Sequence, residues 1–116
     1  MIEIQYAEPT AALRRMFFQL VDATDGLTPE TGEAGGQPQI SIAGAAWANS
    51  TNTLTAIGNG RYYVQLTEAE VTQDIRTVIE GRYKSANTAE GVATTVQIVF
   101  DSSANNTSGS EITVYD

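Results

Sequence analysis

The chain has 116 residues, of which 41% are hydrophobic and 17% charged, and its formal net charge is −8. This length suits one domain with a single core, and the negative charge is repelled by nucleic-acid phosphates and anionic lipids, so we expect neither nucleic acid nor membrane as a partner. Cysteine and histidine are both absent, which excludes disulfides, Ser-His-Asp and Cys-His catalysis, and most transition-metal sites.

Residues 1–12 are predicted to form an N-terminal arm or a first strand. Ile2, Ile4 and Tyr6 alternate with polar residues before Pro9 interrupts the pattern. Glu3 stands where a signal peptide would carry a base, and no apolar run approaches the roughly 20 residues that span a bilayer. We therefore expect synthesis in the cytoplasm and no export by the Sec route.

A central strand is predicted over residues 13–21, because Met16, Phe18 and Leu20 alternate with residues of a second face. A long polar loop follows, ending at Gly35 and Gly36, and loops of this length often carry function. A short strand is predicted over residues 37–42. The single tryptophan, Trp47, is expected to anchor the core or an edge of the domain.

A hairpin is predicted around Gly58-Asn59-Gly60, which can adopt positive φ between the apolar runs 53–57 and 61–66. Alternation within the second run places Tyr62 and Val64 in the core, and Arg61 and Gln65 away from it. Thr67-Glu-Ala-Glu70 then matches a capping box and predicts a short helical turn over residues 68–73.

Two further strands are predicted over residues 77–85 and 92–100. Inward positions in the first are Ile79, Gly81 and Tyr83; in the second they are Val96, Ile98 and Phe100, with Thr95 and Gln97 facing away. The composition of residues 101–110 indicates a flexible linker, and residues 111–116 read as a C-terminal strand. Residues 13–100 form the predicted domain, an all-β, immunoglobulin-like, two-sheet antiparallel sandwich with one short helical turn and no disulfide.

Two kinds of binding chemistry are weighed against structural roles. Asp22-Ala-Thr-Asp-Gly26 fails as an EF-hand because the first ligand position falls on Val21, although a looser calcium site from Asp22, Asp25 and Glu30 stays open beside a plain turn. The aromatic residues leave sugar or base stacking open, but aromatic residues at period two on strands are more often core: Phe17, Trp47, Tyr62 and Tyr63. We expect no catalysis, no metal and no cofactor.

Several segments resemble small immunoglobulin-like proteins of tailed bacteriophages. The resemblance runs from about residue 13 to residue 100 and leaves out both ends. It rests on "VDATDG" and "TPETG" in residues 21–32, "PQIS" at residues 38–41, and "AIGNGRYYVQLT" at residues 56–67. It implies a non-enzymatic virion structural protein, made in the host cytoplasm and then part of the virion.

Within that class, a small domain without a shaft or coiled coil looks most like a capsid decoration, or cement, protein that binds between major capsid subunits. The alternatives are a tail, baseplate or head–tail accessory subunit, or a module for adhesion to the host surface. A receptor- or glycan-binding module is expected to show a concave aromatic or polar cluster in its loops. The long loop over residues 24–36 holds no aromatic residue, which disfavours sugar binding.

The ends of the chain supply the predicted partner-binding residues. Apolar alternation there suits addition of a strand to a neighbour's sheet, and the residues are Ile2, Ile4, Tyr6, Ile112, Val114 and Tyr115. The competing prediction is that both ends complete the domain's own sheets. Because one small domain would bind weakly, we expect a homo-oligomer, with a trimer favoured.

Overall fold

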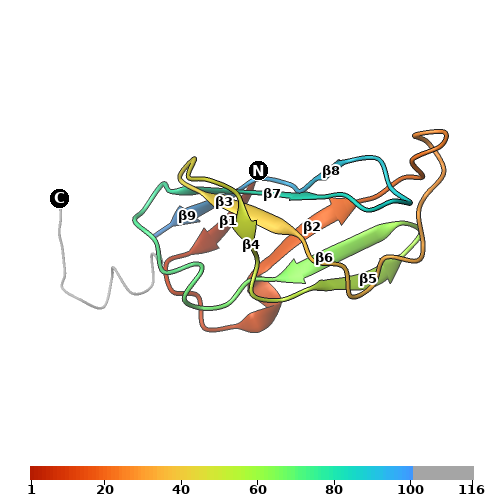
Figure 1. Cartoon of the computed structure of the whole chain (residues 1–116). Helices are drawn as coiled ribbons and strands as arrows, with labels where there is room; N and C mark the ends of the chain where they lie inside the picture. The colour runs from red at the N-terminus through yellow and green to blue at the C-terminus, as the bar shows by residue number, and fades with distance from the viewer. Residues whose placement is uncertain (101–116) are drawn as a thin grey trace, which may run out of the picture.

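The structure is a computed structural model that describes residues 1–100, which fold into two β-sheets around one core (Figure 1). One 3₁₀ helix, Ala11–Leu13, leads into the first strand of the smaller sheet. The predicted linker and C-terminal strand, with Ile112, Val114 and Tyr115, lie outside the described residues.

The larger sheet has six strands in the order β1-β9-β7-β3-β4, with β8 also pairing with β7. Their bounds are β1 Ile2–Gln5, β3 Gln39–Ile42, β4 Ala48–Asn49, β7 Val78–Tyr83, β8 Gly91–Val92 and β9 Val96–Val99. The other sheet has three strands in the order β2-β6-β5: β2 Arg15–Gln19, β5 Leu54–Gly58 and β6 Arg61–Gln65.

The hairpin prediction is confirmed. β5 and β6 pair antiparallel, and Gly58, Asn59 and Gly60 between them have φ of 120°, 55° and 77°. A side chain at Gly60 would stand 2.7 Å from the Leu20 carbonyl oxygen, so this turn needs glycine for space as well as for φ. Leu20 N–H also donates to Gly60 O at 2.8 Å, while Leu20 O accepts from Glu30 N–H at 3.0 Å.

The predicted inward faces are also confirmed. Tyr62, Val64, Val96 and Ile98 are all at most 1% exposed, and their strands present the alternate residues to the outside. Both sheets contribute to the core through such faces, because apolar residues at period two all point to one side of a strand. The core cluster includes Met16, Phe18, Leu20, Ile40, Leu54, Ile79 and Tyr83.

Four details differ from the prediction. First, the fold is not purely antiparallel: β1 pairs parallel with β9, with Ile2 opposite Val96 and Ile4 opposite Ile98. Second, β2 is an edge strand of its sheet and not a central one, since only β6 pairs with it as a strand. Both facts depend on which distant strands meet, and local alternation carries no information about that.

Third, the strand predicted over residues 92–100 is broken into β8 and β9, and its last residue, Phe100, is 66% exposed. The break falls where Thr94 N–H turns to bond the Phe17 carbonyl on β2, 3.0 Å away. Fourth, the turn predicted over residues 68–73 is shorter: residues 68–71 form a single hydrogen-bonded turn, in which Val71 N–H bonds to Thr67 O at 3.3 Å. The capping box itself is present, because Thr67 N–H bonds Glu70 Oε1 and Glu70 N–H bonds Thr67 Oγ1.

Two tyrosines fix the long loop across the end of the two sheets. The Tyr62 hydroxyl on β6 donates to Glu30 O at 2.7 Å and accepts from Glu33 N–H at 3.2 Å. The Tyr83 hydroxyl on β7 donates to the buried Glu33 carboxylate at 2.7 Å. Burial, together with the Glu33 carboxylate, raises the pKa of Tyr83 to about 12, so the hydroxyl stays protonated as a donor. In turn this hydrogen bond lowers the pKa of Glu33.

We expect Val96→Asp to lower the free energy of unfolding by about 3–5 kcal/mol, because it places an unpaired charge in the core. Thr95→Asp, next to it on the half-buried face, is expected to cost far less. Urea unfolding of both variants measures the difference. Equal destabilisation would contradict the observed register of β9.

We expect Tyr83→Phe to cost about 1–3 kcal/mol at pH 7, because it removes the hydrogen bond that contributes most to stabilising the buried Glu33 carboxylate. Since the folded pKa of Glu33 lies below the ordinary value of 4.5, the stabilisation is complete above about pH 4.5 and is lost as the pH falls through the lowered pKa. Urea unfolding at pH 7 and pH 3 should show the variant's deficit shrinking at pH 3. Tyr63→Phe, on the half-buried outer face of the same β6 strand, is the matched control and should be near neutral.

Candidate binding surfaces

The three predicted binding residues of the N-terminal segment differ in how far they are buried. Ile4 is 2% exposed and belongs to the core, so its side chain is not available to a partner. Ile2 is half-buried against the same core, while Tyr6 is 49% exposed. The strand itself belongs to this domain's larger sheet, so of the two alternatives the first strand is confirmed and the detached arm is not. Pairing with β9 satisfies one edge of β1, and Ile4 packs into the core.

The other edge of β1 is open. Ile2 and Tyr6 N–H groups bond to the Thr95 and Val99 carbonyls of β9, so alternation turns the main-chain groups of Glu3 to the opposite edge. No main-chain group within residues 1–100 pairs with Glu3 there. β1 is therefore an edge strand with an unused donor and acceptor, the kind of edge to which another strand can add.

An apolar slot runs beside this edge, between β1 and β2. It has a volume of about 280 Å³, and its lining includes Ile2, Leu13 and Phe17. Leu13 is 59% exposed and Phe17 38%, although both are large apolar residues. Glu3, Glu8 and Arg15 also line the slot, so its rim is polar.

The long loop does not bring together Asp22, Asp25 and Glu30, the looser calcium site that the sequence left open beside a plain turn. Asp25 Oδ1 accepts the N–H groups of Leu27 and Thr28, both at 2.9 Å, and its other oxygen accepts the Thr28 hydroxyl. These bonds, the hydroxyl first, lower the pKa of Asp25 to about 2. Asp22 and Glu30 line a neighbouring hollow that does not include Asp25. Within residues 1–100, no group of three or more acidic residues is placed to hold a metal ion.

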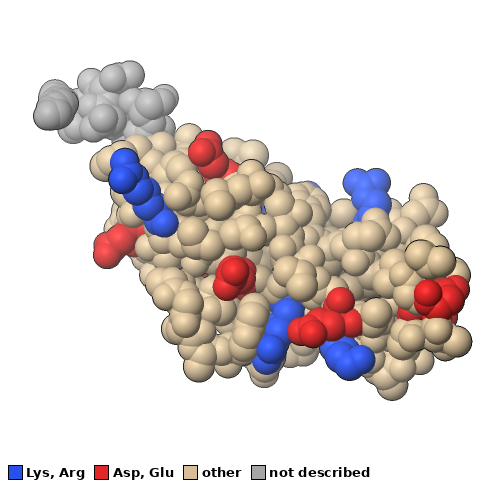
Figure 2. Space-filling model, turned by 90° about the horizontal axis from the view of Figure 1, so that it is seen from above, with Lys and Arg blue, Asp and Glu red and all other residues tan. Residues whose placement is uncertain are grey.

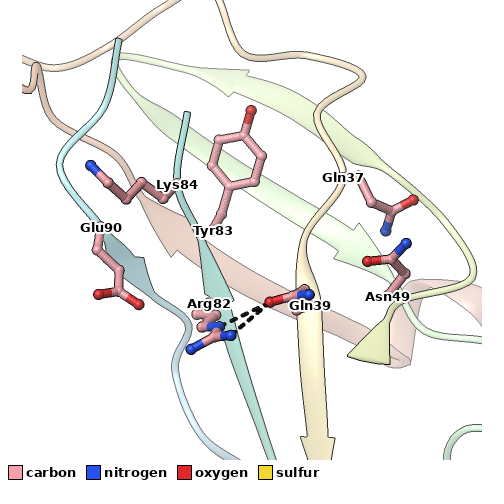
Figure 3. Close-up of a pocket in the computed structure, with 7 residues that line it drawn as sticks. All are labelled: Gln37, Gln39, Asn49, Arg82, Tyr83, Lys84 and Glu90. Atoms are coloured by element: carbon pink, nitrogen blue, oxygen red, sulfur yellow. Dashed lines mark hydrogen bonds between the residues drawn. The ribbon is translucent and has the colours of Figure 1, made fainter. Parts of the chain in front are cut away.

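A polar hollow of about 360 Å³ lies on the outer face of the larger sheet (Figure 3). Its lining comes from β3, β4, β7 and the segment before β8: Gln37, Gln39, Asn49, Arg82, Tyr83, Lys84 and Glu90. At its centre, Arg82 Nε and Nη2 donate to Gln39 Oε1 at 3.0 and 2.9 Å. The amides of Gln37 and Asn49 lie on one side of this pair, and Lys84 and Glu90 on the other.

Trp47 belongs to this surface and not to the core. Its ring is 36% exposed and lies 4.3 Å from the Arg82 guanidinium carbon, in a cation–π contact. Arg82 lies between the inward positions Gly81 and Tyr83 and faces outward, as their alternation implies, but the sequence did not predict that it meets Gln39 and Trp47. The signal that was available is the alternation of Gln37 and Gln39 along one strand face.

Charges of both signs are interspersed on the face shown in Figure 2, and acidic side chains gather at the end that carries the long loop. No extended basic patch is seen on this face.

Among residues 1–100 there is no helix with the length and apolar character needed to span a bilayer.

The chain matches no protein-family model, no curated protein and no solved structure.

We expect the Asp25 carboxyl to titrate at about 2 in ¹³C NMR, and Thr28→Ala to raise its pKa toward the ordinary value of 3.8. Thr28→Ser, which keeps the hydroxyl, is the control. Because the folded pKa is lowered, this carboxylate stabilises the loop above about pH 4, and the effect is lost as the pH falls toward 2. A calcium-dependent change in the Asp25 titration would mean that the loop binds the ion after all.

Proposed function

We propose that this protein is a non-enzymatic virion structural protein with an immunoglobulin-like β-sandwich, and that it decorates the capsid by binding between major capsid subunits. The motifs of residues 13–100 support the virion context. The open edge of β1 beside the apolar slot is the single observation that carries the binding role.

The proposed contact is strand addition at β1. An extended segment of a capsid subunit pairs with the main-chain groups of Glu3, and its alternate side chains enter the slot beside Leu13 and Phe17. Main-chain pairing supplies affinity and the slot supplies selectivity. Ile4 contributes only its backbone, because its side chain is part of the core.

A slot of about 280 Å³ offers little contact area, well below that of a stable protein–protein interface. Several copies that share one capsid site gain avidity without any stronger single contact. We therefore propose that the protein acts as an oligomer, a trimer seated where capsid subunits meet. A tail, baseplate or head–tail accessory subunit would use the same edge, and cryo-EM of the virion distinguishes these locations.

The test removes the free edge donor without disturbing the pairing of β1 with β9. Glu3→Pro deletes the N–H that points to the open edge, and proline is tolerated at such a position in an edge strand. We expect capsid binding, measured by co-sedimentation with undecorated capsids of the cognate phage, to weaken by about tenfold or more. Glu3→Ala keeps the N–H and is the matched control.

A second variant guards against a folding defect in Glu3→Pro. Leu13→Glu places a charge in the slot at a residue that is already 59% exposed, so its melting temperature should stay close to that of the wild type while capsid binding falls. Undiminished decoration by both folded variants would rule out this edge as the contact.

A further inference from the structure

The polar hollow around Arg82 has the features of a ligand site, and it is separate from the slot beside β1. The two share no lining residue. Its volume of about 360 Å³ is at the lower end of the range for small-molecule pockets, about 300–1,000 Å³. A ligand held here would therefore be the size of one or two sugar rings or a comparable polar group.

Arg82 is held in place before any ligand arrives. The Trp47 ring stacks against the guanidinium, whose carbon lies 4.3 Å from the ring centre, and Gln39 Oε1 accepts hydrogen bonds from both Nε and Nη2. Because Gln39 is neutral, these bonds orient the guanidinium without cancelling its charge. Within residues 1–100, no acceptor is found for Nη1. A fixed, uncompensated guanidinium suits a carboxylate.

The surrounding groups suit hydroxyls. Gln39 Nε2 and the Asn49 amide make no hydrogen bond with any residue from 1 to 100, so they present both donors and an acceptor to the hollow. Lys84 makes only one long bond, 3.4 Å to Thr88 O, and Glu90 adds an acceptor on the same side. Glu90 and the net charge of −8 oppose a polyanion such as nucleic acid.

We propose that this hollow binds a carboxylated sugar, with the carboxylate on Arg82 and the ring hydroxyls on the amides of Gln39 and Asn49. The function proposed above does not depend on this site. Such binding would let a decorated particle adhere to acidic glycans of a cell surface.

The single tryptophan gives a direct readout, since Trp47 touches Arg82. The full-length protein is titrated with sialyllactose up to about 20 mM, a range that detects millimolar dissociation constants. We expect a saturable change in tryptophan fluorescence. Lactose, which lacks the acidic sugar, and sodium acetate, which lacks the hydroxyls, are expected to give no saturable change.

Arg82→Gln is expected to weaken sialyllactose binding by about tenfold or more, because it removes a charge-assisted hydrogen bond. Gln39→Glu should weaken it as well, since a carboxylate at that position would pair with Arg82. Arg15→Gln is the matched control: Arg15 also lies 4.3 Å from an aromatic ring, that of Tyr63, and bonds a glutamine, Gln65, but on the other sheet. Its titration should equal that of the wild type.

Three results would overturn the proposal: no saturation with sialyllactose, an equal response to lactose, or unchanged binding by folded Arg82→Gln. Capsid co-sedimentation of the same variant separates this site from the β1 edge. We expect Arg82→Gln to decorate capsids normally while it loses the sugar.

Discussion

The fold depends on two tyrosine hydroxyls that tie one loop to both sheets. Tyr62 comes from the three-stranded sheet and Tyr83 from the six-stranded sheet, and they meet the loop at Glu30 and Glu33. The segment from residue 22 to residue 36 covers one end of the core. Without these bonds, its buried polar groups at Glu30 and Glu33 would lose their hydrogen-bond partners. The loss of stability would be largest at Glu33, because this residue is only 6% exposed and its carboxylate would lose the Tyr83 donor that takes the place of water.

Close packing protects this arrangement. A Cβ atom on Gly36 would lie 2.3 Å from the Tyr83 hydroxyl oxygen, and one on Gly81 would lie 2.4 Å from the Met16 sulfur. The loop and β7 therefore pass as near to their neighbours as glycine allows. This packing confines the Tyr83 hydroxyl, and the hydrogen bond that the hydroxyl donates lowers the pKa of Glu33 although burial acts to raise it.

Local patterns predicted what local physics decides. Alternation identified the inward residues of β2, β6, β7 and β9, and Gly58-Asn59-Gly60 identified the hairpin, because side-chain direction and turn geometry depend on adjacent residues. The parallel pairing of β1 with β9 joins residues more than ninety positions apart, and no local pattern specifies it. The polar hollow was missed for the same reason: Gln39, Trp47 and Arg82 become neighbours only once the order of β4, β3 and β7 is known.

The two surfaces lie at different places on one sheet, and this bears on how they can work together. β1 forms one edge of the six-stranded order, whereas the hollow lies toward β3 and β4 at the other end. A strand added at β1 extends the sheet sideways and leaves the outer face over β3 and β7 uncovered. A copy of the protein that is bound through the edge of β1 would therefore still expose Arg82 and Trp47. A partner strand at β1 would not block a ligand in the hollow. Because the sites share no residue and no strand, the effects of variants at the two surfaces should add.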